Sequence, residues 1–120
     1  MTATVKARGA VGAVVDGYMR DTKLVLDQDF PVFSMGRDAQ GSGYRNKVLA
    51  YRVPVEIGGI TIDPGDIVFG DIDGVVVIPK AIEQQALEIT FAKVRDERAT
   101  RQAVEQGMSA KEAVERFGVF

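Results

Sequence analysis

Apolar residues in the first two thirds of this chain occur in short runs separated by glycine, proline and aspartate. The runs at residues 10–15 and 75–78 are rich in β-branched residues and apolar on both faces, which predicts buried strands, the first of the parallel type. Residues 30–35 form another short apolar run, and Pro31 places it near an edge or at the start of a strand. We therefore expect a strand-rich body in this part of the chain.

The middle of the chain carries turn signals. Gly58 and Gly59 lie between two β-favouring stretches, so residues 48–62 are expected to form a hairpin. Residues 36–47 are rich in glycine and are the most loop-like stretch. These signals divide the strand-rich body into short strands joined by turns.

The last third has the spacing of an amphipathic helix. Residues 81–106 carry apolar side chains at helical intervals, with charged and amide groups between them. Leu87, Phe91 and Val94 are expected to share the inner face. Gly107 then provides a natural C-terminal stop.

A second, shorter helix is expected after that stop. Ser109 and Glu112 form the sequence pattern of a capping box, and Val114 and Phe117 are expected to face inward. Gly118 ends the segment. The pattern as a whole predicts an α/β domain with a β-rich body, a long helix and a short terminal helix.

Composition narrows the possible chemistry. The chain has 120 residues with no cysteine and no histidine, which excludes disulfides, zinc–thiolate sites and histidine-based triads. Any metal site is expected to use oxygen ligands, which suit Mg²⁺, Mn²⁺ or Ca²⁺. The net charge of −2, with scattered basic residues, argues against a nucleic-acid partner. No apolar run approaches the ~20 residues of a membrane span, so we expect a cytoplasmic protein without membrane contact.

The first candidate site is the pair Arg20 and Asp21. Asp16 and Gly17 are expected to end the first strand, which places the pair just beyond it, where α/β proteins usually bind ligands. Arginine holds a carboxylate through a bidentate fork, and the adjacent carboxylate can hold a hard cation. On spacing alone, however, a surface ion pair at a turn is the more common arrangement.

Two other segments are weaker candidates. Asp71 and Asp73 have the spacing of calcium ligands, but the further acids of an EF-hand loop are missing, so a tight turn between strands is favoured. The glycine-rich residues 36–47 fit neither phosphate-binding fingerprint. A surface loop is the better interpretation there.

Several segments, taken in order, form one pattern over nearly the whole chain. They are Val15-Asp16-Gly17 with Arg20-Asp21, Phe30-Pro31-Val32-Phe33, Val53-Pro54-Val55 with Gly58-Gly59, Pro64-Gly65-Asp66 with Asp71, Asp73-Gly74-Val75-Val76-Val77-Ile78-Pro79, and a tail with Glu97, Arg101 and Gly107-Met108-Ser109. This pattern resembles the RraA-like family, which includes the class II pyruvate aldolases for 4-hydroxy-4-methyl-2-oxoglutarate.

The resemblance implies a swivelling β/β/α-type fold and a homo-oligomer, either a trimer or a dimer of trimers. It implies a metal-dependent lyase that cleaves 4-hydroxy-4-methyl-2-oxoglutarate to pyruvate or decarboxylates oxaloacetate, both of them small 2-oxo acids. Arg20 and Asp21 would be the catalytic residues. Arg20 would bind the substrate, and Asp21 would hold the divalent metal, Mg²⁺ or alternatively Mn²⁺.

The chain also departs from the family pattern. Catalytic members carry a further aspartate and a substrate-binding loop at positions that would fall before Met1. We therefore expect residues 1–120 to be a single RraA-like domain that lacks the family's N-terminal half and is weak or inactive as a lyase. The alternatives are a non-catalytic regulator that binds a protein partner, such as an RNA-degrading endonuclease, and a folded remnant without a function of its own.

Overall fold

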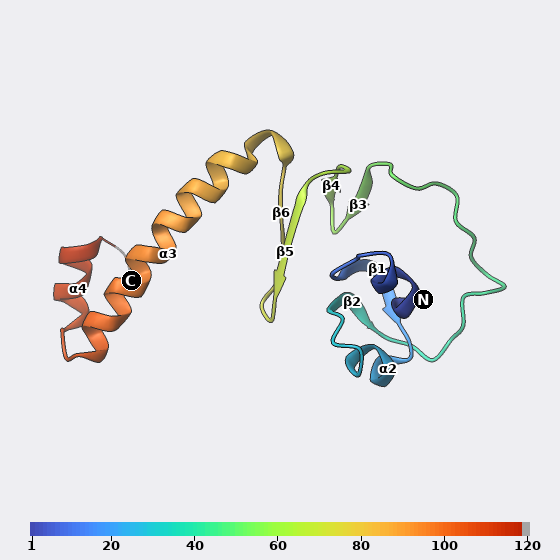
Figure 1. Cartoon of the computed structure of the whole chain (residues 1–120), viewed down its shortest axis with the longest axis horizontal. Coiled ribbons are helices and arrows are strands. Elements are labelled where there is room, and N and C mark those ends of the chain that lie inside the picture. The colour runs from blue at the N-terminus through green and yellow to red at the C-terminus, as the bar shows by residue number, and fades with distance from the viewer. Residues whose placement is uncertain (119–120) are drawn as a thin grey trace. The chain divides into compact units, whose positions relative to one another are not determined.

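The computed structural model describes residues 1–118 of the chain, which divides into two compact units, Met1–Pro79 and Lys80–Phe120. Within the described residues, the first unit holds every strand and the second is helical (Figure 1). The predicted α/β class, with a β-rich body followed by a long and a short helix, is therefore confirmed.

The first unit is built from short elements. They are α1 (Thr2–Ala7), β1 (Ala13–Met19), α2 (Thr22–Leu26), β2 (Val32–Arg37), β3 (Val55–Ile57), β4 (Ile60–Ile62), β5 (Ile67–Asp71) and β6 (Gly74–Ile78). The strands pair two by two: β1 with β2 in parallel, and β3 with β4 and β5 with β6 antiparallel. The pattern gave no signal for α1, which is too short to show a helical period.

The first strand runs further than its sequence suggests. The parallel pairing of β1 is confirmed, but Asp16 and Gly17 do not end the strand, because it continues to Met19. The ladder shifts register between Val15 and Tyr18, so the two residues between them form an irregularity inside the strand. Such a bulge lets a strand carry turn-like residues without ending.

The expectation of buried strands is wrong. Every residue of β1 and β6 is half-buried or exposed, and Val76 in the centre of β6 is 57% exposed. The physical reason is that each sheet has only two strands, so every strand is an edge with little around it. The apolar residues that are buried in this unit are Val25 on α2 and Phe30 just before β2.

The turns follow the sequence signals closely. Gly58 and Gly59 adopt positive φ angles of 60° and 79° in the β3–β4 hairpin, as glycine allows without strain. The segment from residue 48 to residue 54 lies outside the strands, so the predicted hairpin is shorter than expected. The β5–β6 turn is closed by the pairing of Asp71 with Gly74.

The second unit contains a 3₁₀ turn (Lys80–Ile82), α3 (Glu83–Glu105) and α4 (Ala110–Phe117). The long helix ends at the predicted place, with Gly107 at φ 99° just beyond it. Among residues 1–118 no helix combines the length and the apolarity that crossing a membrane would need.

Helix α4 begins with the predicted capping box. The Ser109 hydroxyl accepts a hydrogen bond from the Glu112 backbone N–H at 3.3 Å, and the Ser109 N–H donates to Glu112 Oε2 at 3.1 Å. Gly118 ends the helix in the left-handed conformation. The start and the end of α4 are therefore confirmed.

The inner faces of these two helices differ from the prediction. The buried side chains are Thr100 on α3 and Ala113 on α4, whereas Phe91 is 65% exposed and Val114 is 46% exposed. Helix α4 packs against the last turns of α3 (Figure 1). Phe91 belongs to an earlier turn of α3, before the residues that contact α4, and so stays exposed. Small side chains let the two helices approach closely at the contact.

Candidate functional site

The pair Arg20 and Asp21 lies directly after β1, at the carboxyl end of the strand. Strand β2 runs parallel to β1, and its last residue, Arg37, pairs with Met19. The Asp38 N–H donates to the Met19 carbonyl at 2.9 Å, so the segment after β2 starts beside Arg20. The carboxyl ends of the two parallel strands thus meet at one edge, the usual place for a ligand in α/β proteins.

Arg20 and Asp21 form an ion pair with each other. Arg20 Nε lies 3.3 Å from Asp21 Oδ2, and the two side chains are 54% and 56% exposed. Water screens a pair this exposed, so it adds little to stability. The contact uses the Nε side of the guanidinium group, which leaves terminal N–H groups of Arg20 for another anion.

The backbone at Asp21 has an unusual conformation. Its φ of 60° and ψ of 33° lie in the left-handed region, which aspartate and asparagine tolerate better than most residues. Asp21 is the N-cap of α2, but its side chain makes no capping hydrogen bond. Its carbonyl oxygen instead accepts from the Val25 N–H at 3.1 Å. The carboxylate is therefore not used to start the helix.

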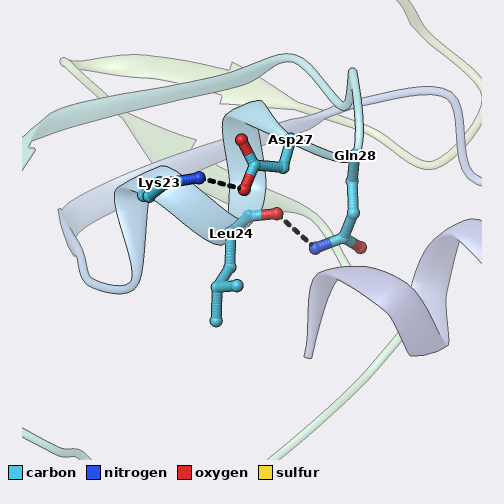
Figure 2. A network of polar contacts seen from close by, with 4 residues as sticks. All are labelled: Lys23, Leu24, Asp27 and Gln28. Carbon is cyan, nitrogen blue, oxygen red and sulfur yellow. Dashed lines mark hydrogen bonds and ion pairs between the residues drawn. The ribbon is translucent and has the colours of Figure 1, made fainter.

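Two local polar contacts join α2 to the residues that follow it (Figure 2). Lys23 Nζ lies 2.6 Å from Asp27 Oδ2, and Gln28 Nε2 donates to the Leu24 carbonyl at 2.6 Å. Val25 on the inner side is 7% exposed. Both polar contacts join residues four apart in this segment, so of these contacts only the burial of Val25 packs the helix after Asp21 against the rest of the unit.

The loop after β2 reaches Arg20 through Gly41. A Cβ atom at Gly41 would lie 3.1 Å from Arg20 Nη1, so the guanidinium group rests against the glycine backbone. The Gly41 carbonyl also accepts a hydrogen bond from Arg45 Nε at 3.3 Å. Gln40 extends this arrangement, because its Oε1 accepts from Arg45 Nη1 at 2.6 Å and its N–H donates to Asp38 Oδ1 at 3.1 Å.

No pattern in the sequence predicted this meeting of Arg20 with the loop. Residues 36–47 were expected to form a surface loop, and from Asp38 onward they do, in an exposed segment. The contact at Gly41 depends on the parallel register of β1 and β2, which brings distant segments together. No local sequence motif encodes that register.

The described residues offer few ligands for a metal. Among residues 1–118 no group of three or more acidic, histidine or cysteine side chains lies together. Asp21 supplies one carboxylate, and Mg²⁺ commonly binds proteins through one or two carboxylates while keeping several waters. The donor set therefore fits a hydrated, weakly held ion.

Asp71, the last residue of β5, and Asp73, in the turn after it, have a structural role instead. Asp71 Oδ1 accepts a hydrogen bond from the Asp73 N–H at 2.8 Å, which is the contact of an Asx-turn. The tight turn expected at this position is confirmed.

Comparison with known proteins relates the sequence to one family. The family model described as RraA-like, Aldolase/RraA, matches residues 1–77. A protein of Halalkalibacterium halodurans named "Putative 4-hydroxy-4-methyl-2-oxoglutarate aldolase" is 36% identical over 105 residues, which is 88% of this chain and 50% of that protein. Protein DlpA of Legionella pneumophila is 32% identical over 117 residues, which is 98% of this chain and 19% of that protein.

Two solved structures are also similar to this chain. An uncharacterized protein from Pseudomonas syringae pv. tomato aligns with a TM-score of 0.90 and 35% identity, covering 94% of this chain and 56% of that one. A structure described as novel cellulases from microbes associated with the gut ecosystem aligns with a TM-score of 0.77 and 41% identity, covering 82% and 45%. The chain thus spans about half the length of the Halalkalibacterium relative and of both solved proteins.

Proposed function

Because the chain belongs to the RraA-like family, we propose that it provides part of the active site of a divalent-metal-dependent 2-oxo-acid lyase. The reactions are the aldol cleavage of 4-hydroxy-4-methyl-2-oxoglutarate, which yields pyruvate, and the decarboxylation of oxaloacetate. One observation carries the proposal: the guanidinium group of Arg20, with N–H donors left over from its ion pair, lies beside the Asp21 carboxylate at the carboxyl end of β1, and that carboxylate makes no capping hydrogen bond to α2.

Arg20 is the substrate-binding group in this proposal. Its terminal N–H groups form a planar fork that matches the two oxygens of the carboxylate next to the 2-oxo group. Binding there places the 2-oxo oxygen on the side of Asp21, since the two side chains are in contact at 3.3 Å. Asp21 would hold the divalent ion, which when bound supplies a Lewis acid for the charge that develops on that oxygen.

The chemistry needs a stabilised negative charge. Breaking the C3–C4 bond leaves its electron pair on C3, from which it spreads onto the 2-oxo oxygen as an enolate. The other fragment leaves as CO2 from oxaloacetate, or as a second pyruvate once the 4-hydroxyl has lost its proton, and a proton from solvent at C3 converts the enolate to pyruvate. A positive guanidinium fixed beforehand stabilises such charge without having to reorganise. A Schiff-base lysine is not required, and the nearest lysine in sequence, Lys23, is paired with Asp27 at 2.6 Å.

We expect the activity of this chain alone to be weak. Its pair is exposed to solvent, and a single carboxylate holds Mg²⁺ loosely. The chain also spans only about half of the aldolase-named relative. Orientation of a substrate by surrounding groups can lower the activation free energy by about 7–11 kcal/mol. An incomplete set of such groups lowers it by less.

The test is pyruvate release from oxaloacetate and from 4-hydroxy-4-methyl-2-oxoglutarate, with Mg²⁺ and with a chelator. We expect slow, chelator-sensitive release that is lost in Arg20→Ala and kept in Arg95→Ala, which removes an exposed arginine from α3. Release that persists in Arg20→Ala at the parent rate would contradict the proposal. No release by a folded parent chain would favour the alternative, a non-catalytic regulator with a protein partner.

A further inference from the structure

One exposed segment of the first unit combines positive charge with large apolar side chains. Residues 45–52 lie between β2 and β3 in a stretch without helix or strand (Figure 1). The charged residues of this segment are all cations, Arg45, Lys47 and Arg52. Three large apolar side chains lie between Lys47 and Arg52, and Leu49 among them is 86% exposed. We call residues 45–52 the basic segment.

The β5–β6 hairpin has the opposite charge. From residue 53 to residue 79 the sequence has no lysine and no arginine. The charged residues of this stretch are Glu56, Asp63, Asp66, Asp71 and Asp73. Asp63 precedes β5 and is exposed, and Asp71 and Asp73 are exposed at the turn between β5 and β6. Acidic groups therefore flank the hairpin at both ends, and we call residues 63–78 the acidic hairpin.

The acidic hairpin also has an exposed apolar face. Phe69 on β5 pairs with Val76 on β6, and each is 57% exposed. The ring of Phe33 contacts the hairpin at Gly70, and neighbouring residues of a strand point to opposite faces, so Phe69 lies on the face away from that ring. In the part of the chain that the structure describes, the outer edge of each of the two strands has no hydrogen-bonded neighbour. Such an edge can pair with an extended segment from another chain.

The basic segment and the acidic hairpin match in pattern and in length. The first has apolar side chains between cations, and the second has an apolar pair between acids. Five residues, Lys47–Tyr51, span about 17 Å when extended, the same length as the five residues of β5. An apolar centre inside a charged rim is the usual composition of an interface between proteins, and opposite charges on the rim give specificity for the partner.

The two surfaces do not meet within one copy of the chain. Val48, Leu49 and Tyr51 remain between 80% and 86% exposed in the folded chain, so the hairpin of the same copy does not cover them. We propose that the basic segment of one copy binds along the acidic hairpin of a second copy of this chain. The contact is heterologous, because it joins two different surfaces, and its repetition links copies head to tail. It does not depend on the proposed lyase chemistry, because neither surface contains Arg20 or Asp21.

Charge reversal on each surface tests the proposal. Lys47→Glu with Arg52→Glu makes the segment acidic, and Asp63→Lys with Asp73→Lys adds positive charge at both ends of the hairpin. Both double variants keep the carboxylates that accept backbone hydrogen bonds in the two turns. Sedimentation velocity should show the parent associating and each double variant associating at least about tenfold more weakly, because like charges then face each other.

Mixing the two double variants should restore association, because each acidic surface then meets a basic one. A chain that carries all four changes should also associate like the parent. The matched control is Arg95→Glu with Arg98→Glu, which changes the charge by the same amount as the segment variant, at exposed positions of α3, and should leave association unchanged. Circular dichroism verifies that each variant is folded.

Three outcomes would overturn the proposal. The first is a parent that stays monomeric at micromolar concentration. The second is a hairpin variant that associates like the parent, which would place the basic segment against a different surface. The third is a mixture of the two folded double variants that associates no better than either variant alone.

Discussion

The ring of Phe33 on β2 fills the space into which a side chain at Gly70 on β5 would extend. A Cβ atom at Gly70 would lie 2.6 Å from both Cε2 and Cζ of the ring, a distance that real Cβ contacts essentially never reach. This contact joins the parallel pair β1–β2 to the antiparallel pair β5–β6 within the first unit. It connects the strand before the Gly41 loop to the turn at Asp71.

We predict that Gly70→Ala destabilises the first unit. The methyl group would force the ring or the strand to move, and overpacking of this kind costs about 1–3 kcal/mol. Urea unfolding followed by fluorescence or circular dichroism measures the loss. Gly43→Ala is the matched control, because a Cβ atom there meets nothing within 4 Å. Phe33→Leu should reduce the cost of the Gly70 change, and strictly additive effects would contradict the contact.

A second prediction concerns the clearance at Gly41. A methyl group there would lie 3.1 Å from Arg20 Nη1, so the flexible end of the arginine must shift. We expect Gly41→Ala to fold normally and to weaken 2-oxo-acid binding or turnover by about tenfold, within the range caused by small misplacements of binding groups. The test is to measure 2-oxo-acid turnover or affinity for Gly41→Ala and Gly43→Ala. If the two variants have the same turnover and affinity, the substrate lies away from Arg20.

The third prediction is that Asp21 is the principal protein ligand of the divalent ion. Asp21→Asn keeps a side chain that tolerates the φ of 60° and removes only the charge. We expect Mg²⁺ and Mn²⁺ to bind at least roughly tenfold more weakly to this variant in isothermal titration. Asp71→Asn, in the β5–β6 turn, should bind like the parent. Equal binding by the parent and Asp21→Asn would place the metal elsewhere.

The sequence predicted the local features of the fold well. Turns and helix ends depend on a few neighbouring residues, so Gly58, Gly107 and the Ser109 capping box are found where they were expected. The burial of strands was predicted badly. The apolar run that includes Val75 and Val76 shows only that the strand favours an apolar environment, and in the structure it is not buried. Whether anything covers that strand depends on tertiary partners.

The same distinction holds for the candidate site. The position of Arg20 and Asp21 after a strand follows from the sequence pattern. The contact of Arg20 with Gly41 does not, because it depends on the parallel pairing that brings β2 beside β1. Long-range register is set by whole strands, and no spacing within the loop reports it.

The fourth prediction concerns pH and the start of α4. Hydrogen bonds from the Ser109 side chain and from its backbone N–H lower the pKa of Glu112 below the ordinary value of 4.5. Because the folded state favours the ionised form, this stabilisation is fully present above the ordinary pKa and is lost as the pH falls through the lowered one.

NMR titration of the Glu112 carboxyl carbon measures this effect. We expect a lower pKa in the parent than in Ser109→Ala, and more fraying of α4 in the variant near neutral pH. Replacing a serine N-cap with alanine costs about 0.5–2 kcal/mol of helix stability. Identical titration curves for the two proteins would show that the capping box is not formed in solution.

The fifth prediction is self-association into a homo-oligomer, with a trimer expected. Large apolar side chains are exposed in succession after the Gly41 loop: Val48 is 83% exposed, Leu49 is 86% exposed and Tyr51 is 80% exposed. Burying such a patch against another copy removes it from water. Sedimentation velocity should show a species larger than the monomer, and Leu49→Asp should shift it toward smaller species. A monomeric parent at micromolar concentration would contradict the prediction.

The left-handed backbone at Asp21 also limits which residues selection can sample at that position. Glycine, asparagine and aspartate bear this conformation with the least strain, and aspartate alone among the three carries a charge. Folding by itself therefore enriches the carboxylate that a metal would need. In a library of variants at position 21, selection for protein abundance alone gives the frequency of aspartate that folding accounts for. If selection for catalysis raises the frequency of aspartate above that value, the increase measures what the carboxylate contributes to the reaction.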